Sequence, residues 1–307
     1  MSAIVMGESL VDVVAGKAHP GGSPLNVAVG LARLGHQVRF HTEFGTDTNG
    51  RLVAEHLAAS SVAVAEGSVT ERPTSVAVVE MDEHSNAHYS FTIQQQLPPL
   101  EMQHAPQLLH AGSIAAWIEP SGEQILRAFA QADTRTLRSY DPNLRPALVG
   151  DRPAALERIE HLMSLSHIVK LSDEDAQWLY PQLEEHQVLA HVAGLGPALV
   201  VLTCGERGAL CWSSGTLSQL PAIPATVRDT IGAGDAFMSG LLHAVLDSPA
   251  LVAALHARQP LDPVQVRRAV TQALCSAALT VARTGANPPW AEELSNAAGR
   301  HLSSPSA

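Results

Sequence analysis

Two aspartates and two glycines share the segment "DTIGAGDAF", residues 229–237. The small residues Gly232, Ala233 and Gly234 would let successive backbone N–H groups converge on one point at the start of a helix. Such a nest suits a phosphate oxygen or a developing negative charge. Asp235 cannot bind an anion, so its expected role is to accept the proton of a hydroxyl that attacks that anion. A purely structural alternative is a helix cap, with glycine for the turn and aspartate for the dipole.

A second polar segment lies near the N-terminus in "GGSPLNVAVGLARLG", residues 21–35. Gly22 would let a ligand approach the backbone, and Asn26 on the first helical turn offers a donor and an acceptor to a hydroxyl. Asp12, just after the first strand, could accept hydrogen bonds from two adjacent hydroxyls. The structural alternative is a glycine-rich connection between a strand and a helix, with asparagine at the helix start.

Short apolar runs that alternate with helical patterns must position these segments. "AIVMG" and "ALVVLTCG" read as buried strands, and residues 232–246 and 262–284 as the clearest helices. This alternation predicts βαβ units, an α/β fold and a mainly parallel sheet covered on both faces. Residues 74–93 break the pattern, because they read as two strands joined by the polar turn "DEHSN". We therefore expect one domain over residues 1–302, a lid from residues around 12–20 and 74–93, and a disordered tail at 303–307.

Composition restricts the partners. The 307 residues carry a formal net charge of −11, which argues against a nucleic-acid surface. No apolar stretch approaches the ~20 residues that span a bilayer. Glu8 and Asp12 interrupt the apolar N-terminal run, so it predicts a strand rather than a signal peptide. These observations predict a cytoplasmic protein with neither nucleic-acid nor membrane partners.

Taken together, the two polar segments resemble the two signatures of the ribokinase-like (PfkB-type) carbohydrate kinases. These signatures are Gly-Gly with a downstream Asn, and D-T-x-G-A-G-D near the C-terminus. Their order, their wide separation and the alternating pattern between them agree with that family over nearly the whole chain. The resemblance implies a ribokinase-like three-layer α/β/α fold, with a mainly parallel central sheet of about nine strands and a β-lid over the sugar.

The resemblance also implies an ATP-dependent sugar kinase. Asp235 would take the proton from the primary hydroxyl of the sugar, and Gly232, Ala233 and Gly234 would form the anion hole for the transferring phosphoryl group. The family's sugar-binding positions fall on Asp12, Gly22, Asn26, Asn143 and Arg145. Its nucleotide-binding positions fall on Ser172, Thr203, Gly205, Gly232 and Gly234. Its monovalent-cation site, built mostly from backbone carbonyls that hold K⁺, falls on Asp229, Ile231, Thr280, Arg283 and Gly285.

One departure from the family concerns Mg²⁺. The family usually has an Asn-x-x-Glu motif that organises water around this ion, whereas "KLSDED" places Ser172 and Asp175 there. Serine loses the amide and aspartate is one methylene shorter, which predicts a looser metal network. Such versions are similar to those of fructokinase-like and 2-keto-3-deoxygluconate kinase-like members. Ser172 is equally well placed to cap a helix.

A second departure is the short segment between Asp12 and Gly21. Its eight residues span ~27 Å when fully extended, which is too little for an out-and-back excursion of two full strands. We therefore expect a reduced lid built mostly from residues 74–93. Relatives often dimerise by clasping lids, so the choice between monomer and homodimer stays open.

The segment "DPNLRP", residues 141–146, bears on the sugar because it resembles the D-x-N-x-R element of fructokinase-like members. Arg145 suits bidentate contact with a carboxylate or a phosphate. A carboxylate would indicate 2-keto-3-deoxygluconate and a neutral sugar fructose, while the structural alternative is an arginine that closes a turn. Glu119 and Gln94 are further candidates for sugar contact that spacing does not establish.

We expect a fructokinase-like enzyme that transfers the γ-phosphoryl of ATP, with Mg²⁺ and K⁺, to the primary hydroxyl of fructose. The enzyme alternatives are a 2-keto-3-deoxygluconate kinase and a ribokinase or nucleoside kinase. An alternative of another class is a catalytically weak sugar sensor. The altered residues Ser172 and Asp175 favour the sensor, and the intact Gly-Ala-Gly-Asp argues against it.

Overall fold

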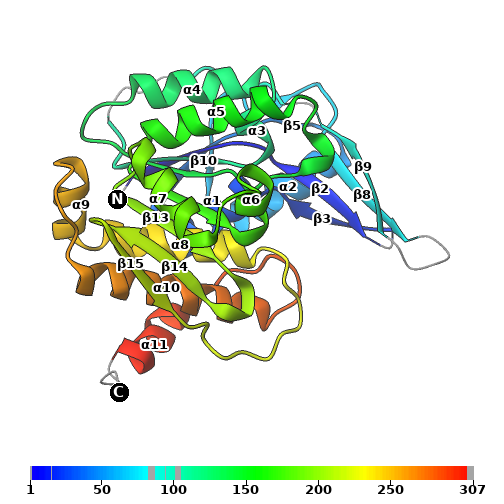
Figure 1. Ribbon diagram of the computed structural model, residues 1–307. Coiled ribbons are helices and arrows are strands. Elements are labelled where there is room, and N and C mark those ends of the chain that lie inside the picture. The colour runs from blue at the N-terminus through cyan, green and yellow to red at the C-terminus, as the bar shows by residue number, and fades with distance from the viewer. Residues whose placement is uncertain (1, 15, 82–86, 94, 101–104, 303–307) are drawn as a thin grey trace.

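The computed structural model describes residues 2–302 except 15, 82–86, 94 and 101–104 (Figure 1). Its centre is a nine-stranded sheet in the order β15-β14-β13-β12-β11-β10-β1-β4-β6, parallel from β13 to β6 and antiparallel at β14 and β15. The α/β prediction is confirmed. The strands are β1 (Ser2–Met6), β4 (Gln37–His41), β6 (Ala63–Val64), β10 (Leu108–Gly112), β11 (Leu137–Asp141), β12 (Ile168–Ser172), β13 (Leu199–Thr203), β14 (Ala209–Ser213) and β15 (Thr216–Leu220).

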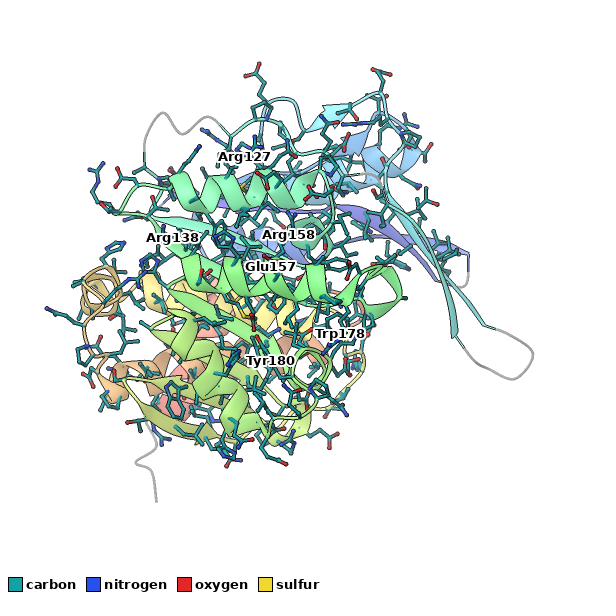
Figure 2. The ribbon with its side chains drawn as sticks, turned by 45° about the horizontal axis from the view of Figure 1, so that its top comes forward. Arg127, Arg138, Glu157, Arg158, Trp178 and Tyr180 are labelled. Carbon is teal, nitrogen blue, oxygen red and sulfur yellow. The ribbon has the colours of Figure 1, made fainter. Side chains whose placement is uncertain are left out.

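Helices cover both faces of this sheet, which makes the three predicted layers. One face packs against α1 (Ser23–Arg33), α2 (Thr48–Ala59), α8 (Ala233–Leu246), α9 (Pro249–His256) and α10 (Pro263–Val281), with α11 (Ala291–Leu302) outside α10. The other packs against α3 (Ile114–Trp117), α4 (Ser121–Gln131), α5 (Arg152–Leu165), α6 (Asp173–Leu179) and α7 (Glu185–Leu195). In Figure 2, Arg127 marks α4 and Arg158 marks the neighbouring α5 on this second face.

Strand β13 shows why the sheet is buried on both faces. Its residues Leu199 and Val201 belong to the core beneath α1 and α8, whereas Val200 and Leu202 belong to the core beneath α5 and α7. Side chains alternate along a strand, so a continuous apolar run supplies both cores at once.

A separate four-stranded sheet forms the lid, in the order β3-β2-β8-β9. Its strands are β2 (Leu10–Val14), β3 (Lys17–Gly21), β8 (Val76–Met81) and β9 (Ala87–Thr92), which extend to the right of the body in Figure 1. The hairpin expected at 74–93 is confirmed, while its turn at 82–86 and the tail at 303–307 lie outside the described residues.

The expectation that residues 12–21 are too short for two lid strands was wrong. Strand β2 starts at Leu10 and pairs antiparallel with β3 as far as Gly21, so each strand has five residues. The length argument failed because the first strand begins at Leu10, before Asp12, and because five residues are enough for each strand. A further small sheet joins β5 (Phe44–Gly45) to β7 (Val69–Thr70), beside β6 and α2 in the chain.

No single helix in the described part of the chain is long and apolar enough to cross a membrane. The consecutive helices α8 and α9 pass that test together on length and composition alone, with a bend of 93° between them.

Four buried histidines predict sensitivity to acid. Burial lowers the pKa of His36, His41 and His167 to about 4 and that of His110 to about 3. In the unfolded chain each of these histidines binds a proton below about pH 6.5, whereas in the folded chain it stays neutral until a much lower pH. The free energy of unfolding therefore falls as the pH falls from 6.5 toward 4, by up to about 1.4 kcal/mol per pH unit for each histidine. We expect the melting temperature, followed by circular dichroism, to fall between pH 7 and pH 5.

The contribution of the histidines to this pH dependence is best tested by comparing variants. Burial raises the pKa of Glu8, Asp12 and Asp141, and these groups stabilise the folded chain as the pH falls, which offsets part of the histidine effect. His41→Gln should reduce the pH dependence, whereas His301→Gln, on the exposed end of α11, should leave it unchanged. Equal pH dependence in His41→Gln and the wild type would contradict this assignment.

Candidate functional site

The two segments singled out by sequence meet at the carboxyl edge of the sheet, where α1 and α8 begin. Asp235 in the first turn of α8 is only 7 % exposed. Its Oδ1 accepts a hydrogen bond from Ser23 Oγ at 2.6 Å, and its Oδ2 accepts one from Asn26 Nδ2 at 2.8 Å. Ser23 and Asn26 stand three residues apart on α1 and so share a face. The carboxylate is thus held at a fixed orientation from two sides.

Close packing of α1 on α8 makes this meeting possible. A Cβ at Gly30 would lie 2.3 Å from Ser239 Oγ, so any larger residue would force the two helices apart. Ala236 and Phe237 of α8 and Leu25 and Val29 of α1 are all buried nearby in the core. The polar site therefore rests on an apolar contact between its two supporting helices.

The predicted anion hole occupies the first turn of α8. Gly232 is the residue before the helix, with φ 74°, and Ala233 begins it. N–H groups in a first turn have no partner within the helix. The Ala233 N–H donates to the Thr230 carbonyl at 3.2 Å. This leaves the following N–H groups, of Gly234 and Asp235, as the better placed donors for an anion.

A buried ion pair lies beneath this turn. Lys170 Nζ is 3.0 Å from Asp141 Oδ2, and the two side chains are 4 % and 0 % exposed. Burial opposes charge on Lys170, but the carboxylates of Asp141, Asp175 and Asp235 raise the pKa of its ammonium. Burial raises the pKa of Asp141 to about 7, against the effect of Lys170.

The predicted sugar-binding residues surround this centre on the lid side. Burial raises the pKa of Asp12, as does the charge of Asp235, while Arg145 and His19 act in the opposite direction. Asp12 lies on lid strand β2, and Gly22 immediately precedes α1.

Arg145 and Asn143 bind each other. The Arg145 guanidinium donates to Asn143 Oδ1 at 2.8 Å and to the Leu144 carbonyl at 2.9 Å, which is the turn-closing alternative. Its charge also acts on Glu8 and Asp12. Of the two further sugar candidates, Glu119 forms an ion pair with Arg158, and Gln94 lies outside the described residues.

Ser172 and Asp175 form a capping box at the start of α6. Asp175 N–H donates to Ser172 Oγ at 3.0 Å, and Ser172 N–H donates to Asp175 Oδ2 at 2.9 Å. Asp175 Oδ1 accepts the Leu144 N–H at 2.8 Å. The helix-cap interpretation of Ser172 is therefore observed, and Asp175 additionally ties the 141–146 loop to α6.

The loops predicted to hold nucleotide and cation are also at this edge. Thr203 Oγ1 donates to the Leu171 carbonyl at 3.3 Å, and Gly205 follows with open space beside it. Asp229 accepts the Ile231 N–H at 3.0 Å and the Gly285 N–H at 2.8 Å, so these two loops lie side by side. The Thr280 carbonyl accepts the Arg283 N–H at 2.9 Å.

Sequence reasoning missed four residues of this centre: Glu8, Ser23, Asp141 and Lys170. Glu8 is buried and accepts the Ala115 N–H at 3.0 Å. Lys170 had a signal, since lysine occurs only at positions 17 and 170 and this one interrupts the apolar run "HIVKLS". A charged residue inside a buried strand requires a partner, which β11 supplies as Asp141.

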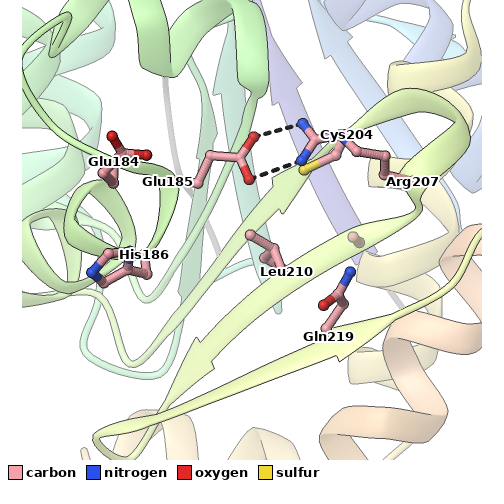
Figure 3. A pocket seen from close by; sticks show the side chains of 8 residues that line it. Glu184, Glu185, His186, Cys204, Arg207, Leu210 and Gln219 are labelled. Carbon is pink, nitrogen blue, oxygen red and sulfur yellow. Dashed lines mark hydrogen bonds and ion pairs between the residues drawn. The ribbon is translucent and has the colours of Figure 1, made fainter.

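A separate pocket of about 270 Å³ opens beside α7 and β14 (Figure 3). Arg207 crosses it and forms a two-pronged ion pair with Glu185, at 2.6 and 3.0 Å. Its lining is Glu184, Glu185, His186, Cys204, Arg207, Ala209, Leu210 and Gln219, none of which is among the residues around Asp235. The pocket therefore adjoins the predicted nucleotide loop, because Cys204 lies between Thr203 and Gly205, while its lining includes none of the residues around Asp235.

Comparisons with known proteins bear on the family and the fold of the chain. Residues 2–293 match the model of the pfkB family carbohydrate kinases. The fructokinase of Rhizobium leguminosarum bv. trifolii is 33 % identical over 234 residues, which cover 73 % of this chain and 71 % of that protein. The crystal structure of a Xylella fastidiosa fructokinase with bound ATP has a TM-score of 0.84 at 24 % identity, and that of a Vibrio cholerae fructokinase double mutant with fructose, ADP and potassium ion has 0.80 at 26 %. Each covers 98 % of both chains.

Proposed function

This chain belongs to the pfkB family of carbohydrate kinases and is an ATP-dependent sugar kinase, and on that premise we propose that its sugar is fructose. The observation that carries the proposed transfer to a sugar hydroxyl is the oriented carboxylate of Asp235, which Ser23 and Asn26 fix beside the N–H groups of α8. The 33 % identical fructokinase supports fructose.

In the proposed reaction, Asp235 accepts the proton of the primary hydroxyl as the hydroxyl oxygen attacks the γ-phosphorus of ATP. The new oxygen–phosphorus bond forms while the bond to the bridging oxygen breaks, and ADP leaves. Ser23 and Asn26 hold the carboxylate toward the hydroxyl. The N–H groups of Gly234 and Asp235 stabilise the negative charge on the transferring group.

The residues present fit a divalent cation. Three carboxylates, Asp141, Asp175 and Asp235, act on the single ammonium of Lys170, which leaves negative charge in excess. Asp141 Oδ1 is buried and has no hydrogen-bond partner within the described part of the chain. Asp141 and Asp175 would hold the water shell of Mg²⁺, which when bound neutralises phosphate charge.

The test is ADP release with Mg-ATP and K⁺ across fructose, 2-keto-3-deoxygluconate, ribose, adenosine and a blank without sugar. We expect the highest kcat/KM with fructose. If another sugar gives the highest kcat/KM, that sugar is the substrate and the fructose proposal is wrong. No turnover with any sugar, together with sugar binding by calorimetry, would instead support the sugar-sensor alternative.

The loops joined by Asp229 lead us to propose a monovalent-cation site, which predicts activation by K⁺. The carbonyls near Asp229 and Thr280 would bind the ion and stiffen the loop before Gly232. Turnover at saturating ATP and fructose should be higher in potassium chloride than in sodium or Tris chloride of equal ionic strength. Equal turnover in the three salts would contradict the proposed monovalent-cation site.

A further inference from the structure

The Lys170–Asp141 pair has a position that stability alone does not explain. Register places the two residues side by side, because Tyr140 and Val169 pair in the parallel strands β11 and β12. Strand alternation then turns Lys170 to the same face as Ile168, which packs on the core beneath α8. A buried ion pair of this kind is often no more stabilising than apolar residues of similar volume.

The ammonium lies next to the first turn of α8. A Cβ at Gly234 would be 3.2 Å from Lys170 Nζ, so the lysine reaches the backbone there because residue 234 is glycine. The N-terminus of a helix carries partial positive charge and repels a cation. Beside this turn the Lys170 ammonium offsets the negative charge of Asp141, Asp175 and Asp235, which would otherwise repel an anion bound by the first-turn N–H groups.

We infer that Lys170, anchored by Asp141, is a positioning residue that supports Gly234 from beneath and strengthens the anion hole for the transferring phosphoryl group. This inference rests on the proposed phosphoryl transfer at Asp235. Lys170 acts through the Gly234 backbone: it fixes the direction of the first-turn N–H groups and adds its charge behind them. Asp141 holds the ammonium in place and limits the cost of burying it.

The kinetic test removes the pair as a unit. The double variant Asp141→Asn/Lys170→Met removes both members of the ion pair, which costs less stability than removing one charged partner. Because Asp141 is also a candidate for the Mg²⁺ site, kcat is measured at saturating Mg²⁺ and compared with that of Asp141→Asn, so that the difference between the two variants reports on Lys170. We expect kcat of the double variant to lie roughly 10–100-fold below that of Asp141→Asn, the range typical of groups that orient a first layer of ligands. The KM for fructose should change little. The control variant Glu123→Gln/Arg127→Met removes an exposed ion pair on α4 and should keep wild-type kcat.

A spectroscopic test uses the wild-type protein, in which lysine occurs only at positions 17 and 170. Lysine labelled at Cε gives two NMR signals, and Lys17→Met identifies which of them belongs to Lys170. Fructose and ADP are added first, followed by aluminium fluoride, a mimic of the transferring phosphoryl group. The Lys170 signal should shift on the last addition.

A folded double variant with the same kcat as Asp141→Asn, or a Lys170 signal that does not respond to aluminium fluoride, would overturn the inference. If the double variant does not fold, the NMR result decides alone. Failure of the proposed sugar is a separate result: wild-type turnover then identifies another acceptor, and the same comparisons are made with that sugar.

Discussion

Asp235→Asn is expected to lower kcat by roughly 10²–10⁴-fold, the contribution of a well-placed general base. An amide cannot take up the hydroxyl proton at neutral pH. It also presents N–H donors to a site where Ser23 Oγ and Asn26 Nδ2 already donate to both carboxylate oxygens. Calorimetry should still detect fructose and a non-hydrolysable ATP analogue, because neither binding event needs the proton transfer.

The matched control is Asp247→Asn at the other end of α8. The Asp247 side chain is 55 % exposed, and its Oδ2 lies 3.5 Å from His243 Nε2. This variant should keep the wild-type kcat. Asp235→Asn with near wild-type turnover and an intact fold would mean that another group accepts the proton.

Sequence alone predicted the fold where one periodicity dominated. The runs at Leu199–Thr203 and Ala233–Leu246 carry unbroken apolar patterns, and both elements formed as expected. The antiparallel strands β14 and β15 were missed because "GALCWSSGTLSQL" has only a short apolar alternation at the edge of the sheet. The lid hairpin at residues 10–21 was misjudged because its register, and not its length, determines where the strands begin.

The sequence likewise predicted some residues of the candidate site and missed others. Asp235 and Asn26 were found because glycines mark the turns that precede them, and the structure joins them directly. Lys170 and Asp141 were missed as a pair, since only the register of β11 and β12 makes them neighbours. The roles of Asn143 and Arg145 stay predictions. Their mutual hydrogen bond fits the alternative of an arginine that closes a turn.

Gly232→Ala is expected to damage both stability and catalysis. Gly232 has φ 74° and ψ 6°, a left-handed conformation that costs an L-residue roughly 1–2 kcal/mol. An added Cβ would lie 2.6 Å from Ala286 Cβ and 2.8 Å from Ala286 Cα, so the loop around Ala286 must move. That loop is tied through the Gly285 N–H to Asp229, and Asp229 accepts the Ile231 N–H next to Gly232. The substitution therefore disturbs the anion hole both through the backbone of residue 232 and through the displaced loop around Ala286.

We expect Gly232→Ala to lose roughly 1–3 kcal/mol of unfolding free energy, measured by urea denaturation, because strain and steric overlap add. Its kcat should fall by roughly 10²–10³-fold, the cost of misplacing one donor for the developing charge. Gly194→Ala is the matched control, since Gly194 lies within α7 with open space around it and alanine favours a helix by ~0.5–1 kcal/mol. If Gly232→Ala lost stability but kept the wild-type kcat, the first turn of α8 would not be the anion hole, because a donor moved by tenths of an ångström cannot serve the same charge equally well.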